Sequence, residues 1–162
     1  MGGIGKADEH RDHKGGGQGI YAGTQAVVES GELFRDLGRF PSQNDAGTVA
    51  FCASLTHGGE GIFTVTGGKI ATVVDGSVFE SFRGALINNA GTVVFLATPP
   101  GGELGIYTLT GRVLARGQEM FGSTVADLAV NPVSLNQSDQ LAIRVGLADQ
   151  RQLIVRADLA RQ

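Results

Sequence analysis

The residues best suited to metal chemistry lie near the start of the chain. Asp8, Glu9, His10, Asp12 and His13 are possible ligands of a divalent cation. A structural metal site needs a rigid frame and outer hydrogen bonds around its ligands, whereas glycines flank this run on both sides. The sequence therefore favours no native metal site here, and it indicates no cofactor.

Other possible catalytic signals are weak. The glycine-rich run at residues 15–19 precedes an expected strand, whereas a phosphate-binding loop follows a strand and opens a helix. His57 has no serine or cysteine with a nucleophile motif near it, although catalytic triads assemble in space. Cys52 lies in an apolar run, where a thiol usually packs as a small hydrophobe. We predict no catalytic residue, and an enzyme with its site in a central channel is only an alternative.

Two sets of repeated residues could bind a glycan or another small ligand. The candidates are Tyr21, Phe63 and Tyr107, and Asn44, Asn88 and Asn136. One aromatic residue per repeat could line a sugar-binding surface, but core packing is the favoured interpretation because aromatic rings dominate core burial. The asparagines could form a polar rim, although a role in tight turns already accounts for them.

These residues belong to a segment that is copied along the chain. Gly-Ile followed by an aromatic residue occurs at residues 19–21, 61–63 and 105–107, with a weaker copy at 153–155. Asn-Asp-Ala-Gly at 44–47 matches Asn-Asn-Ala-Gly at 88–91 and, less closely, residues 136–139. The spacing of these segments, 42 to 48 residues, is typical of propeller or array repeats.

The repeats define the expected domain organisation. Residues 1–18 are predicted to be a flexible, glycine-rich charged tail, and residues 19–162 a single all-β domain. The predicted repeats cover approximately residues 19–60, 61–104 and 105–151, and an extra strand covers residues 152–159.

Each repeat is expected to hold four short antiparallel strands in two hairpins. The runs at residues 49–53 and 93–97 are apolar on both faces, so each should be an interior strand between stacked sheets. We therefore predict β-propeller-type blades, about three plus one extra strand, with a β-trefoil as the alternative. Residues 123–130, between a serine and Pro132, are the one expected piece of helix.

Composition excludes several functions. The 162 residues include 26 glycines, and 13 Lys and Arg against 16 Asp and Glu give a net charge of −3. A large basic surface for nucleic acid or an anionic bilayer is therefore not expected. We also predict no membrane insertion, because there is no run of about 18 apolar residues. The chain starts with no apolar stretch of the signal-peptide type.

A family resemblance rests on the turn segments. Residues 42–51 and 86–95, each followed by a Gly-Gly pair and then Gly-Ile-aromatic, resemble the tandem repeats of uncharacterised bacterial exported, propeller-like proteins that often carry PEP-CTERM-type anchors. Residues 121–136 resemble that family's last repeat. The resemblance implies a propeller-like fold and an extracellular location, and it supplies no catalytic residues. The missing leader and anchor imply a shortened member or a C-terminal fragment with the last three repeats.

We expect a non-catalytic scaffold or interaction domain. Three blades are too few to close a propeller, so the chain is predicted to self-associate through its edge strands, for instance as a dimer with six blades. The alternatives are a lectin-like module that binds a carbohydrate or small molecule, and the enzyme mentioned above.

Overall fold

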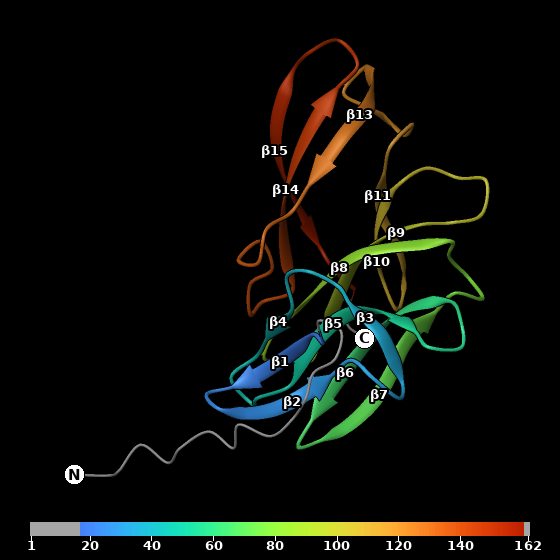
Figure 1. Ribbon diagram of the computed structural model, residues 1–162. Coiled ribbons are helices and arrows are strands. Elements are labelled where there is room, and N and C mark those ends of the chain that lie inside the picture. Colours follow the sequence, from blue (N-terminus) through green and yellow to red (C-terminus); the bar gives the residue numbers. More distant parts are fainter. Residues whose placement is uncertain (1–16, 161–162) are drawn as a thin grey trace.

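The computed structural model describes residues 17–160, and these residues contain strands and turns but no helix (Figure 1). The prediction of an all-β fold is confirmed. The strands are β1 (Gly19–Ala22), β2 (Gln25–Glu29), β3 (Phe34–Leu37), β4 (Ser42–Gln43), β5 (Val49–Leu55), β6 (Glu60–Thr66), β7 (Lys69–Asp75), β8 (Ser81–Ile87), β9 (Val93–Thr98), β10 (Gly105–Thr108), β11 (Gly111–Ala115), β12 (Glu119–Met120), β13 (Ser123–Ala129), β14 (Gln140–Leu147) and β15 (Gln152–Asp158).

The strands form antiparallel sheets that follow one another in chain order, from β1 and β2 at one end to β13, β14 and β15 at the other (Figure 1). We name them the N-terminal hairpin (β1, β2), blade 1 (β3, β5, β6, β7, with β4 also paired to β5), blade 2 (β8 to β11) and blade 3 (β12 to β15). Each blade is an antiparallel meander, and in blade 1 β3 and β4 together take the place of one strand because both pair with β5. Such sheets, stacked face to face, are propeller-type blades rather than a trefoil.

The strand registers show which residues are equivalent between blades. The same position of the second and third long strands is occupied by the pairs Cys52–Ile62, Leu96–Ile106 and Arg144–Ile154. The strands β1, β6 and β10 also share a bulge directly after their isoleucine. The weak sequence copy at residues 153–155 is therefore a true structural equivalent, and the expected C-terminal strand is β15.

The sequence repeats and the sheets are out of phase by half a blade. Residues 61–104 supply the last two strands of blade 1 and the first two strands of blade 2. The N-terminal hairpin corresponds to the last two strands of a blade, and blade 3 ends at the third of its long strands.

An apolar core lies between each pair of neighbouring sheets. In β5, the side chains of Phe51 and Ala53 join the core shared with the N-terminal hairpin, whereas Ala50 and Cys52 join the core shared with blade 2. In β9, Phe95 faces blade 1 while other residues face blade 3. The prediction that both strands are covered above and below is confirmed.

Aromatic side chains fill equivalent places in blades 1 and 2. Phe34, Phe51 and Phe63 form one triad, and Phe79, Phe95 and Tyr107 form the other, with ring centroids 4.7–6.0 Å apart. The corresponding places in blade 3 hold Val125, Ile143 and Val155. Four of these six contacts are edge-to-face, a geometry that adds to the stabilisation from burial alone.

The glycine before each isoleucine leaves room for an aromatic ring. A Cβ atom on Gly61 would lie 2.7 Å from the Val74 carbonyl oxygen and 3.0 Å from the ring of Phe63. At Gly105 the ring of Tyr107 would be 2.8 Å away. The Gly-Ile-aromatic segment therefore combines a close backbone contact with two side chains for two different cores.

The expected helix at residues 123–130 is wrong, because these residues form β13. The strand has a register shift between Val125 and Asp127, so Val125 and Leu128 lie three positions apart and yet both enter the core. A bulge adds one residue to a strand and in this case imitates helical spacing. Gly67 and Gly68 form the two-residue turn between β6 and β7, since Thr66 pairs with Lys69.

The close contact at Gly61 predicts a specific sensitivity. Gly61→Ala should lower the free energy of unfolding by about 1–3 kcal/mol, because the new methyl group meets a backbone oxygen that cannot move freely. Gly76→Ala is the matched control, since its nearest atom would be 3.4 Å away. Urea denaturation of both variants measures the difference, and equal losses would contradict this account of the repeat.

Candidate functional site

The three candidate asparagines occupy equivalent turns in successive blades. Asn44 lies between β4 and β5, Asn88 between β8 and β9, and Asn136 between β13 and β14. Each side-chain oxygen accepts a hydrogen bond from the backbone N–H four residues later, at 2.9–3.0 Å. The left-handed conformation in these turns belongs to the fourth residue and not to the asparagine, for example to Gly91 with φ 82°.

The same asparagines connect the turns to one another. The Nδ2 atom of Asn44 donates to the carbonyl oxygen of Asn88 at 3.1 Å, and Nδ2 of Asn88 donates to that of Asn136 at 3.0 Å. We name these three residues the asparagine ladder. A second row runs beside it, in which backbone N–H groups of Asp45 and Asn89 donate to the side chains of the next turn.

Asn88 is the buried centre of the ladder. Its side chain is 1% exposed, and its Nδ2 atom also donates to Asp139 Oδ1 at 2.8 Å. Thr92, 3% exposed, donates its hydroxyl to the same carboxylate oxygen at 2.7 Å. A buried polar group of this kind is stabilising only while its partners are present. The ladder therefore fixes how far apart neighbouring blades lie at this edge.

The aromatic candidates have different surroundings from one another. Phe63 is 3% exposed and Tyr107 is half-buried, and both belong to the aromatic triads, so the core-packing interpretation is confirmed for these two. Tyr21 is 51% exposed, and its hydroxyl donates to Glu29 at 2.6 Å. The structure does not bring the three rings to one surface. Ligand binding by the aromatic residues and asparagines stays a prediction.

The two end faces of the stack expose the residues that the interior buries. Ile62 and Ile106 are 0% exposed, whereas their equivalent Ile154 on β15 is 75% exposed. Arg144, beside Ile154, occupies the place of Cys52 and Leu96. The sequence analysis missed this face, although the arginine at an aligned apolar position was the available signal.

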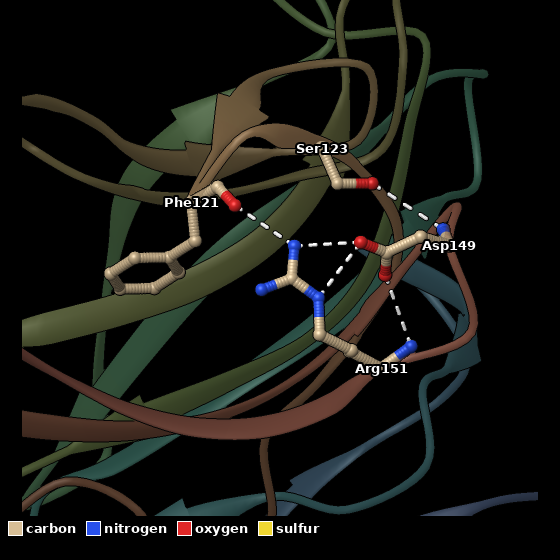
Figure 2. Close-up of polar contacts among 4 residues, drawn as sticks. All are labelled: Phe121, Ser123, Asp149 and Arg151. Atoms are coloured by element: carbon tan, nitrogen blue, oxygen red, sulfur yellow. Dashed lines mark hydrogen bonds and ion pairs between the residues drawn. The ribbon is translucent and has the colours of Figure 1, made fainter.

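Blade 3 carries a polar cluster where two of its turns meet, shown in Figure 2. The Arg151 guanidinium donates to Asp149 Oδ2 and to the Phe121 carbonyl oxygen, each at 2.8 Å, and the Asp149 N–H donates to the Ser123 hydroxyl at 3.3 Å. The hydrogen bond from Arg151 lowers the pKa of Asp149 below its ordinary value. Because these partners all belong to this turn pair, the cluster holds the two turns together.

The described residues contain no cluster of metal-binding side chains. Between residues 17 and 160, no three His, Cys, Asp or Glu side chains are placed to share a metal ion. His57 is exposed in the turn after β5. The cluster from Asp8 to His13 lies outside the described residues, as does most of the expected tail. Gln18, the last residue assigned to that tail, bonds to Ser30 and Leu37.

Comparisons with protein-family models, with curated proteins and with solved structures find no match to this chain. Within residues 17–160, no helix is long and apolar enough to cross a membrane.

The ladder predicts a large loss of stability on substitution of Asn88 and a small one on substitution of Asn136. Asn88→Asp keeps the oxygen that bonds to Thr92 but places a buried carboxylate against Asp139, which should lower the free energy of unfolding by roughly 3 kcal/mol or more at pH 7. Burial and the neighbouring charge raise the pKa of the new carboxyl, so the loss should shrink as the pH falls towards 4. Urea denaturation at both pH values measures it.

Asn136→Asp is the matched control for this substitution. Asn136 is exposed, and among residues 17–160 its Nδ2 atom bonds only to the Gln140 side chain, at 2.9 Å, so the expected loss is below about 1 kcal/mol. Similar losses at both positions would show that the inter-blade hydrogen bond is unimportant.

Cys52 provides a pH-dependent test of the core between blades 1 and 2. Burial, with smaller contributions from Glu60 and Asp36, raises the pKa of the thiol from 9.0 to about 11. The folded chain keeps this proton to a higher pH than the unfolded chain, so stability should fall as the pH rises between these values. The free energy of unfolding should be lower at pH 10 than at pH 8 in the wild type, and the difference should be smaller in Cys52→Ala. Equal differences in the two proteins would contradict burial of the thiol as the cause.

Proposed function

We propose that this protein is a non-catalytic β-repeat interaction domain that self-associates end to end. In this arrangement, the blade 3 face of one copy covers the exposed face of the N-terminal hairpin of another. The carrying observation is the exposure of Ile154, 75%, at a position whose equivalents Ile62 and Ile106 are fully buried by the next sheet.

The interior of the stack indicates what such a contact would bury. Ile62 of blade 1 and Tyr107 of blade 2 contribute to the same core, and Ile20 of the hairpin packs against the core that holds Phe63. An isoleucine from one sheet and a ring from the next thus meet at two successive interfaces. A second copy would supply the ring that Ile154 lacks, in the form of Tyr21.

The backbone of β15 offers a second contact to another chain, at the edge of the sheet and in addition to its face. β15 is equivalent to β6 and β10, each of which has a further strand beside it, but β15 pairs with β14 and with no other described strand. Unpaired edge strands readily pair with another chain. The ladder is also open, since Nδ2 of Asn136 bonds within its own turn instead of reaching a next turn.

Charged residues on the two end faces affect how strongly the copies bind and which faces meet. Arg144 lies 3.5 Å from Asp127 and adds a charge to the Ile154 face, where the interior has Cys52 and Leu96. This weakens the apolar contact. Glu29, bonded to Tyr21, carries the opposite charge at the other end face. A head-to-tail contact between different faces forms a ring or an open chain, depending on the rotation between copies.

The resemblance to tandem-repeat exported proteins agrees with this proposal, because repeats in a longer array are covered by their neighbours. It extends the proposal to a member of such a family, located outside the cell.

Sedimentation velocity over a range of concentrations tests the proposal with three variants. Wild type should show reversible association, and Ile154→Asp should be monomeric. Arg144→Leu introduces the residue found at the equivalent position of blade 2, Leu96. It should tighten association about 10-fold, or ~1.4 kcal/mol. Leu109→Asp is the control, since Leu109 is 58% exposed in a turn of blade 2. Wild type and Arg144→Leu that are both monomeric at every concentration would overturn the proposal.

A further inference from the structure

A cavity of about 420 Å³ lies where segments of three successive blades meet. Its size is within the range of small-molecule pockets. Blade 1 contributes Phe40, from the link between β3 and β4, and blade 3 contributes the segment after β13. The remaining wall is blade 2, and the lining residues are Phe40, Arg83, Gly84, Ala85, Leu86, Leu96, Val130, Asn131 and Pro132.

The walls are apolar except at two places. Arg83 is the extra residue at the bulge of β8, between Phe82 and Gly84. Within residues 17–160, no hydrogen bond or ion pair engages its guanidinium. Asn131 uses its side-chain oxygen to accept from Val133 and Ser134, so its amide nitrogen can donate. The cavity thus combines an apolar interior with one unpaired cation and one amide donor.

Phe40 is held in an unfavourable conformation at the cavity. Its φ angle is 61°, which is uncommon for a bulky residue, and its side chain is 71% exposed. Backbone strain of this kind concentrates at ligand-binding sites. The exposed ring adds a flat apolar surface on which an aromatic or alkyl group would stack.

We propose that this cavity binds a small organic carboxylate with an aromatic or aliphatic body. The apolar body occupies the space between Leu96 and Phe40, and Arg83 pairs with the carboxylate, for which guanidinium has the matching two-donor geometry. Asn131 donates a further hydrogen bond. Val130 and Asn131 also line the hollow beside Ile154 on the end face, whereas Phe40, Arg83 and Leu96 do not. The proposal uses no contact between copies and so does not rest on self-association.

The probes are 2-naphthoate and the uncharged 2-naphthylmethanol, titrated at pH 7 into ¹⁵N-labelled full-length protein. Amide NMR signals of residues 83–86, 96 and 130–131 should shift, and the carboxylate should bind about 10-fold more tightly than the alcohol. Arg83→Gln should remove this preference and leave alcohol binding unchanged. Arg83→Lys should keep part of it.

Arg35→Gln is the control, because Arg35 is exposed on β3 and does not line the cavity. The spectrum of each variant also reports whether it is folded. The proposal is overturned if neither probe shifts these signals at millimolar concentration, if the two probes bind equally to wild type, or if Arg35→Gln removes the preference as effectively as Arg83→Gln.

Discussion

The structure depends on the burial of both faces of its central strands. β5 and β9 carry apolar side chains above and below the sheet, so an isolated blade 1 or blade 2 in water would expose two apolar faces. Removing apolar surface from water stabilises the folded state by about 25 cal/mol per Å². Neighbouring blades are therefore the source of most of the stability of each blade, and the stack behaves as a one-dimensional array.

The asparagine ladder adds geometry to this non-directional attraction. Apolar contacts tolerate small sliding movements, whereas a hydrogen bond from Asn88 to the next turn has a defined length and direction. The ladder lies at one edge of the sheets and the aromatic triads lie within the cores. Together they fix both the distance between blades and their register, which explains why the turn and the Gly-Ile-aromatic segment are the best preserved parts of the repeat.

Much of the fold could be predicted because it depends on local patterns. The two-faced apolar runs, the turns and the alternation in β15 all depend on residues close together in sequence. The helix was predicted from Ser123 as a cap and from Pro132 after it, and it was wrong because pairing with β14 makes residues 123–129 a strand. The ladder was missed because the partner of each amide lies in the next blade. The exposure of Ile154 could not be predicted either, since it depends on what covers β15 and not on its own sequence.

The half-blade offset between the sequence repeat and the sheets has a consequence for how such chains change in length. One repeat unit, such as residues 61–104, spans two sheets and carries both halves of an interface. In-frame duplication or loss of such a unit by recombination would leave every remaining junction intact. Units of this kind can therefore be gained and lost in whole multiples, and the two end surfaces keep their chemistry whatever the number of units between them.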